Sequence, residues 1–341
     1  MRALSILLAP ALMHAAGGPR QGLAHFYYVD DAAAWQSLEQ NAASIDLLSP
    51  VWIEVRTGGE VRTSVDDRVV RLAGAAGFEL MPVVMNQDFR PEIAREVLGD
   101  DRKRTALAMK LARFALVEGF RGLQLDFENL EEADRDGYSK LAEQLGSALR
   151  RGGRQLSVAV AAPVYSTGPV NAPPVSWQPT PRSAAFDYER LAAAADFLTL
   201  MAYDQYATPD APGPVAGLPW VEACVRHLLE RVPAEKVTLG VPLYHRHWAG
   251  ARVTTGAWAE AQAAAIRANV ASLFDRLHQE SVIRYEDSSP HVIWLHDARS
   301  VALRRDLAAR YGLRGFSAWR LGQEDPAVWP RLFPPGKDAA R

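Results

Sequence analysis

The stretch RGLQLDFE (Arg121–Glu128) decides the fold prediction, because polar and apolar side chains alternate along it. Successive side chains of a strand point to opposite faces, so Gln124, Asp126 and Glu128 share one face. In a barrel of parallel strands this polar face points inward and rises toward the C-terminal rim, where active sites are built. Buried carboxylates without partners are costly, so two acids on this face predict a functional site. The structural alternative is an acid neutralised by arginine or by backbone donors.

Similar short apolar runs alternate with longer stretches of helical period on both sides of this segment. The predicted strands are Leu23–Tyr28, Ile45–Ile53, Glu79–Met85, Gly122–Phe127, Gln155–Ala161, Phe197–Tyr203, Val237–Pro242 and Arg314–Trp319. The helical stretches between them include Val65–Ala76, Arg104–Glu118, Tyr138–Arg151, Pro219–Arg231 and Ala298–Tyr311. Eight strand–helix repeats predict an α/β protein with a (β/α)8 TIM barrel. The alternative is a doubly wound open sheet, which is disfavoured because no GxGxxG loop follows the first strand.

Two stretches interrupt the repeat. Pro163–Pro181 is rich in proline and glycine and predicts a long loop after the fifth strand. Gly256–His296 holds one helical run, Ala257–His278, followed by two β-like segments, Val282–Tyr285 and Val292–His296. We expect a small α+β insertion between strands seven and eight, over about residues 250–296, with an elaborated seventh helix as the alternative. The catalytic domain then spans residues 20–333, followed by a disordered tail over 334–341.

Composition limits the function classes. The chain has 341 residues, 48% of them hydrophobic and 23% charged, with a formal net charge of −2. A chain of this length buries about 75% of its unfolded surface and needs no disulfide to hold a core. Near-neutral charge disfavours nucleic acid and anionic lipid as partners. The single cysteine, Cys224, excludes an intrachain disulfide and a cysteine-based zinc site.

The N-terminus has the layout of a secretory signal peptide. Arg2 precedes an apolar run from Ala3 to Met13, and small residues follow it. We therefore predict a signal peptide over residues 1–16 and a secreted, periplasmic or cell-surface protein. The alternative is a disordered or strand-forming N-terminus of a cytoplasmic protein. No other segment approaches transmembrane length, so we expect no membrane span. We also expect a monomer.

The two acids of the central segment fit general acid–base chemistry. Two carboxylates within about 7 Å disfavour double ionisation, which raises one pKa toward the range of a general acid. Glu128 lies nearer the rim and is the natural proton donor, whereas Asp126 below it would orient the reacting group. No second acid at a strand end is placed as a nucleophile across the cleft, so a two-carboxylate retaining glycosidase is not the first choice.

Four stretches together resemble glycoside hydrolase family 18. Arg121–Glu128 is similar to its strand-four signature, whose fully acidic form is DGxDxDxE. The other matches are LTLMAYDQY (Leu198–Tyr206) to its MxYD motif, LGVPLYHRHW (Leu239–Trp248) to its GxPxYxxxW segment, and GFSAWRLGQEDPAVW (Gly315–Trp329) to its strand-eight end. The resemblance runs from about His25 to Leu332. It is greatest to the bacterial branch of spore-cortex and cell-wall-acting members, in which a GPxAxLPW segment (here Gly213–Trp220) recurs.

The resemblance implies a retaining mechanism in which the substrate's own 2-acetamido group attacks the anomeric carbon. It implies that Glu128 protonates the leaving oxygen and that Asp126 holds the acetamido N–H. It also implies that Tyr203 bonds the acetamido carbonyl with Asp204 nearby, and that Trp319 forms an apolar floor under the sugar. Strict alternation places Met201 inward with Tyr203 but Asp204 outward, so the role of Asp204 requires the strand to end or twist there.

Arg121 and Gln124 depart from the fully acidic signature. Without a deep acid to share a proton, Asp126 is expected to be more permanently ionised, and Gln124 to donate a hydrogen bond to it. Tyr27, Asn86 and Tyr244 stand at predicted strand ends, where they would either line sugar subsites or pack at the rim. His245 and His247 lie two residues apart without an HExxH or Asp-rich partner, so we interpret them as a solvated loop and predict no metal and no cofactor.

These inferences predict a secreted glycosidase that cuts a β-linked polysaccharide containing N-acetylglucosamine, either peptidoglycan or a chitin-like polymer. The first alternative is a lectin-like family member that keeps the sugar cleft but has lost efficient catalysis, and Gln124 weakly favours it. The second is a metal-dependent hydrolase built on His245 and His247, which a strong chelator would inhibit.

Overall fold

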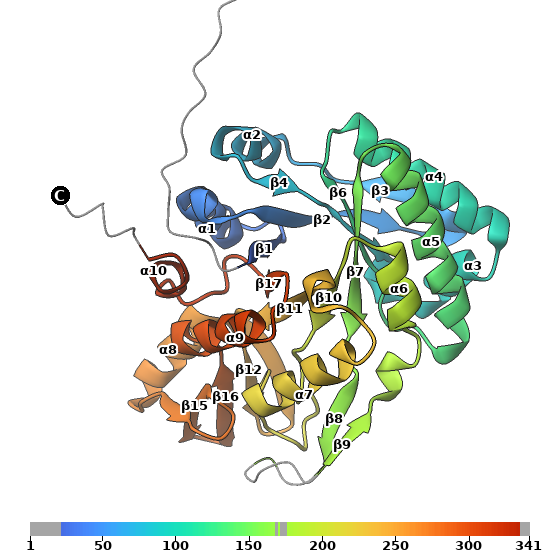
Figure 1. Ribbon diagram of the computed structural model, residues 1–341. Helices are drawn as coiled ribbons and strands as arrows, with labels where there is room; N and C mark the ends of the chain where they lie inside the picture. Colours follow the sequence, from blue (N-terminus) through green and yellow to red (C-terminus); the bar gives the residue numbers. More distant parts are fainter. Residues whose placement is uncertain (1–21, 168–169, 171–175, 335–341) are drawn as a thin grey trace, which may run out of the picture.

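The computed structural model describes residues 22–167, 170 and 176–334 (Figure 1). Eight parallel strand positions close into a barrel, because β1 pairs with β17 on one side and with β2 on the other. The barrel strands are β1 (Leu23–Tyr28), β2 (Leu47–Val55), β4 (Glu79–Leu80) continued by β5 (Val83–Asn86), β6 (Gly122–Asp126), β7 (Gln155–Ala161), β10 (Phe197–Met201), β11 (Val237–Pro242) and β17 (Gly315–Trp319). The predicted (β/α)8 TIM barrel is thus confirmed.

Helices cover the outside of the barrel. They are α1 (Ala32–Asn41), α2 (Asp67–Ala76), α3 (Pro91–Leu98), α4 (Asp101–Val117), α5 (Arg135–Arg151), α6 (Tyr188–Ala194), α7 (Leu218–Leu229), α9 (Ala298–Arg310) and α10 (Val328–Leu332). Local sequence sets several of their ends. The Asp100 carboxylate accepts hydrogen bonds from the first backbone N–H groups of α4, and Gly77 ends α2 in the left-handed region at φ 83°.

Small polar side chains fill one layer inside the barrel. His25 lies between the hydroxyls of Ser317 and Ser49, with nitrogen–oxygen distances of 2.8 and 2.7 Å. Thr199 and Thr238 continue this network at an oxygen–oxygen distance of 3.0 Å. Burial lowers the pKa of His25 to about 3, so the ring is neutral at ordinary pH. The layer supports the strand ends above it without adding a charge.

The predicted α+β insertion between strands seven and eight is present. It consists of β12 (Tyr244–Ala249), β13 (Arg252–Ala257), α8 (Trp258–Ala268), β14 (Leu273–Asp275), β15 (Glu280–Glu286) and β16 (Pro290–Leu295), and its strands form a five-stranded antiparallel sheet. The insertion starts at Tyr244, before the expected start near residue 250. Its helix is shorter than the predicted Ala257–His278, because Asn269 ends α8 in the left-handed region at φ 52°.

The predicted loop Pro163–Pro181 is partly wrong, since it contains an antiparallel hairpin. Strand β8 (Val164–Thr167) pairs with β9 (Ser176–Pro179), although Pro163 precedes β8 and Pro179 is the last residue of β9. Prolines are tolerated in such an edge hairpin because the missing N–H groups face away from the pairing. A further short strand, β3 (Val61–Thr63), pairs with the end of β2. In Figure 1 the hairpin and the insertion project at the lower end of the view.

Some sequence predictions fall outside the described residues. The proposed signal peptide over residues 1–16 and nearly all of the tail over 334–341 belong to this group. Within the described part of the chain, no helix combines the length and the apolar character that a membrane crossing requires.

Candidate active site

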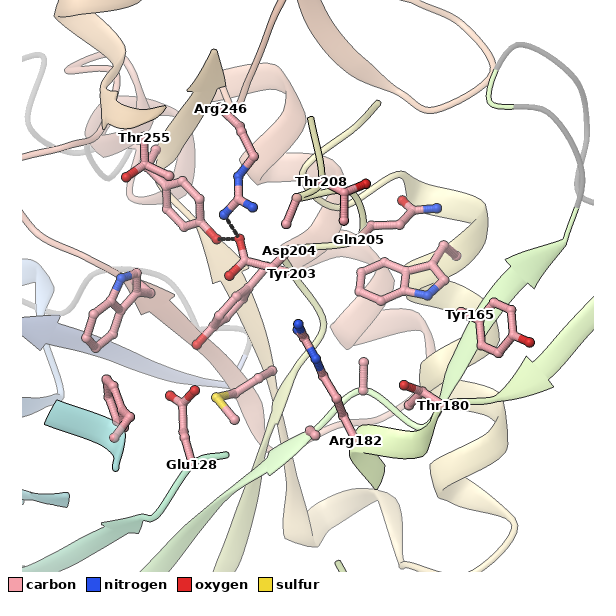
Figure 2. Close-up of a pocket in the computed structure, with 18 of the residues that line it drawn as sticks. Glu128, Tyr165, Thr180, Arg182, Tyr203, Asp204, Gln205, Thr208, Arg246 and Thr255 are labelled. Carbon is pink, nitrogen blue, oxygen red and sulfur yellow. Dashed lines mark hydrogen bonds and ion pairs between the residues drawn. The ribbon is translucent and has the colours of Figure 1, made fainter. Parts of the chain in front are cut away.

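A cavity of about 730 Å3 opens at the C-terminal ends of the barrel strands (Figure 2). Its wall contains seven of the ten predicted site residues: Asp126, Glu128, Met201, Tyr203, Asp204, Tyr244 and Trp319. The other three, Tyr27, Gln124 and Asn86, are buried and do not line it. Most of the predicted site residues therefore line one cavity, and the other three form a buried layer that supports its wall.

Asn86 supports the cavity by holding the main chain of Glu128. Its side-chain oxygen accepts a hydrogen bond from the Glu128 backbone N–H at 3.0 Å, and its amide nitrogen donates to the Glu128 carbonyl at 3.3 Å. The same nitrogen donates to the carbonyl of Arg90 at 3.0 Å. Strand β6 has ended at Asp126, so these bonds replace sheet pairing at Glu128. Asn86 thus fixes the main chain from which the side chain of Glu128 extends.

Asp126 and Glu128 are strongly affected by burial and by neighbouring charges. Burial raises the pKa of Asp126 well above its usual value, and the charge of Glu128 raises it further. Burial also raises the pKa of Glu128 to about 7; Asp204 adds to this rise and Arg182 opposes it. The expectation that Asp126 is more permanently ionised is therefore wrong. Burial disfavours the charged form of its carboxyl group, and the replacement of the deeper signature acid by Gln124 does not offset this effect. A carboxyl with a pKa near 7 can both give and take a proton at neutral pH.

Gln124 does not donate to Asp126 as expected. Its side-chain nitrogen donates to the hydroxyl of Tyr27 instead. Tyr27 in turn packs against Trp319, with ring centroids 5.2 Å apart. Among the described residues, one carboxyl oxygen of Asp126 has no hydrogen-bond partner within the protein. Gln124 and Tyr27 thus support the indole of Trp319, and one oxygen of Asp126 is buried without a protein partner.

Strand β10 ends at Met201, and the chain then turns so that Asp204 faces the cavity. Asp204 has φ 60°, a conformation that aspartate tolerates better than most residues. Its carboxylate accepts a hydrogen bond from the Tyr244 hydroxyl at 2.5 Å and forms an ion pair with Arg246 (Figure 2). The break in alternation that Asp204 required is therefore present. Tyr203 lies edge-on to Tyr244, with centroids 6.4 Å apart.

Sequence reasoning missed several residues of the wall. Tyr165, Thr180 and Arg182 come from the hairpin region and the short helical turn that follows it, Pro181–Ser183. Trp220, at the start of α7, donates its indole N–H to the carbonyl of Val164 at 2.8 Å and so ties this region to the barrel. Trp220 belongs to the GPxAxLPW segment quoted above, so the sequence offered a way to identify it as a site residue. Arg182 lies in a proline-rich stretch, where no sequence feature indicated a place in the cavity.

His245 and His247 lie on β12, so their interpretation as a solvated loop is wrong. His245 is buried, and its Nδ1 is 2.9 Å from the carbonyl of Ala257. His247 faces His291, with 2.8 Å between ring nitrogens. Within the described ranges, no group of three or more His, Cys, Asp or Glu side chains is arranged to hold a metal ion.

Comparisons with known proteins agree with this geometry. Residues 92–324, more than half of the chain, match the model of glycosyl hydrolases family 18. An uncharacterized glycosylase, YvbX, of Bacillus subtilis (strain 168) is 23% identical over 91% of this chain and 90% of its own length. The cortical fragment-lytic enzyme of the same organism is 29% identical over 72% of this chain, which spans only 56% of that relative. The crystal structure of a chitinase from Chromobacterium violaceum superposes with a TM-score of 0.82 at 29% identity, covering 91% of this chain and 98% of the chitinase.

Proposed function

The chain belongs to glycosyl hydrolase family 18 and is a glycoside hydrolase, and from this premise we propose that it cleaves β-linked N-acetylglucosamine in a cell-wall or chitin-type polysaccharide. We propose that cleavage proceeds with retention and uses the acetamido group of the substrate as the nucleophile. One observation carries the mechanism: Asp126 and Glu128 line one cavity beside Tyr203 and Trp319. The third carboxylate of the wall, Asp204, is engaged by Arg246 and Tyr244 and is a poor nucleophile.

Glu128 moves the proton in both steps. In the first step the acetamido oxygen bonds to the anomeric carbon, the bond to the leaving oxygen breaks, and Glu128 gives its proton to that oxygen. In the second step water attacks the same carbon, Glu128 takes a proton from the water, and the acetamido group is released. The raised pKa of Glu128, about 7, supports this double role because the group exchanges its proton readily near neutral pH.

The remaining residues position the acetamido group. The carboxyl group of Asp126 lines the cavity and would accept the acetamido N–H, which would orient the acetamido carbonyl toward the anomeric carbon. The hydroxyl of Tyr203 would donate to that carbonyl, and the Asp204–Tyr244–Arg246 group would keep this side of the cavity polar. Trp319 offers an apolar face on which a sugar ring stacks.

The Glu128→Gln variant tests the proposal. It keeps the shape of the side chain but removes the proton donor, so the rate on a chromogenic chito-oligosaccharide or on purified cell wall should fall by about 10²–10⁴. Sugar binding, measured by calorimetry, should be retained. Glu132→Gln is a matched control, because Glu132 is exposed on the same segment and does not line the cavity. Wild-type turnover by Glu128→Gln would overturn the assignment.

Two further measurements separate this proposal from its alternatives. Proton NMR of the first product should show the β-anomer if configuration is retained. Tight sugar binding by the wild-type protein without hydrolysis over days would favour the lectin-like alternative. We also propose export, supported by the sequence of residues 1–16, which is tested by sequencing the N-terminus of protein recovered outside the cell.

A further inference from the structure

Three arginines line the cavity, and their pairing differs. Arg246 forms an ion pair with Asp204, and Arg320 forms one with Asp31 at 2.6 Å. Among the described residues, the Arg182 side chain forms no direct ion pair and no hydrogen bond, although its charge lowers the pKa of Glu128. An unpaired guanidinium in a substrate cavity is a ready partner for an anionic group, since its planar fork matches the two oxygens of a carboxylate.

The side chain of Arg182 enters the cavity on the side of Glu128. Figure 2 shows its side chain pointing into the cavity, with Glu128 to one side and Tyr165 to the other. Its charge acts on Glu128, the group that protonates the leaving oxygen. Thr180 and Gln205 also line the cavity and add a hydroxyl and an amide that can donate hydrogen bonds. An anion bound here would therefore be close to the oxygen that Glu128 protonates.

Resting on the proposed function, we propose that Arg182 binds the lactyl carboxylate of a muramic acid residue in the leaving-group position. In a glycan that alternates N-acetylglucosamine with this sugar, the lactyl ether is on O3, next to the O4 that becomes the leaving oxygen. A carboxylate at that place is within reach of a cation beside Glu128. Arg182 is then a specificity residue that distinguishes wall glycan from chitin, which has no acid at this position.

The charge of the lactyl group also determines which reaction must precede this one. In intact peptidoglycan the lactyl carboxyl group is joined by an amide to the stem peptide and carries no charge. A charged lactyl group appears only after an amide hydrolase uses water to split this bond, leaving the carboxylate on the sugar and the amine on the peptide. The preferred substrate of this enzyme is therefore a glycan strand from which the stems have already been removed.

Measuring kcat/KM on three substrates tests the inference: stem-free wall glycan, the same glycan with stems, and a chito-oligosaccharide. In Arg182→Gln the ratio of stem-free glycan to chito-oligosaccharide should fall about tenfold, the loss of one charged hydrogen-bonded contact. Arg182→Lys should restore part of the ratio, because it keeps the charge but loses the fork. Arg310→Gln is the matched control and should keep the wild-type ratio, since Arg310 is 60% exposed and does not line the cavity.

The outcomes are distinguishable because the ratio cancels any common effect of Arg182 on Glu128. An unchanged ratio in Arg182→Gln would overturn the specificity role and leave the proposed function intact. A wild-type preference for stem-bearing glycan that Arg182→Gln abolishes would also overturn it, because the bound carboxylate would belong to the peptide. A wild-type enzyme that cuts none of the three substrates would overturn the proposed function itself.

Discussion

Glu128 carries the catalytic proton in our proposal, and its burial and the surrounding charges determine the pH range in which it holds that proton. Burial raises the pKa of its carboxyl most, Asp204 raises it further, and Arg182 lowers it. The net result is a pKa of about 7, so the acid form is lost as the pH rises through neutrality. Because the first step needs this acid form, kcat/KM of the wild-type enzyme should decline above about pH 7.

Two substitutions should shift the decline of kcat/KM at high pH, the alkaline limb of the pH profile, in opposite directions. Asp204→Asn removes the negative charge that raises the pKa of Glu128 and frees the cation of Arg246, so the limb should move to lower pH. Arg182→Gln removes a cation that lowers the same pKa, so the limb should move to higher pH. The measurement is kcat/KM on a neutral chito-oligosaccharide from pH 4 to 10. Shifts of the same sign in both variants would show that Glu128 does not set the limb.

At the scale of elements, the close approach of β10 and β11 holds Tyr203 in place. Gly240 of β11 has no room for a side chain, since an added Cβ would lie 2.5 Å from the Leu200 carbonyl oxygen and 2.9 Å from Cε1 of Tyr203. The position of Tyr203 in the cavity wall thus depends partly on the lack of a side chain at Gly240.

Gly240→Ala should therefore lower kcat by pushing the Tyr203 ring away from the acetamido group, and it should also lower stability. A misplacement of about 1 Å can reduce a rate about 10²-fold. Gly74→Ala is the matched control, because an added Cβ at this exposed position of α2 meets nothing within 4 Å. The control should keep full activity and unfold at the same temperature or slightly higher. Unchanged kcat in Gly240→Ala would show that the position of Tyr203 does not limit the reaction.

The elements differ in how far sequence alone could predict them. Alternation in Arg121–Glu128 was sufficient to predict β6 and the inward position of Asp126, because a period of two is a local property. The clamp of Asn86 on Glu128 was not visible, since it depends on β5 lying beside β6 with Met85 aligned to Asp126. Arg182 was missed for the same reason. Only the folded hairpin region brings it to the cavity, and prolines concealed that hairpin.

At the scale of the whole molecule, a buried ionic cluster joins the insertion to the barrel. Glu280 of β15 accepts backbone hydrogen bonds from Val215 at 2.8 Å and Ala216 at 3.1 Å, in the segment that follows β10. Burial alone would raise the pKa of Glu280, but His296 and Arg304 hold it below its usual value. Arg304 of α9 also donates to the carbonyls of Ala216 at 2.6 Å and His278 at 3.1 Å. Three separate parts of the chain therefore share one buried set of bonds.

This sharing predicts that the barrel and the insertion unfold together. Arg304→Met would remove the cation beside the buried Glu280 and would leave four carbonyls without this donor in a fully buried site, at a cost of about 3–5 kcal/mol. In a chain of this length that loss corresponds to a fall in Tm of about 5 °C. Arg310→Met on the same helix is the control. Its guanidinium is 60% exposed and pairs with Glu222 at 3.3 Å, so its loss should cost less than about 1 kcal/mol. Scanning calorimetry should show one transition for all three proteins, shifted only in Arg304→Met, whereas two transitions in the wild-type protein would show that the insertion folds independently of the barrel.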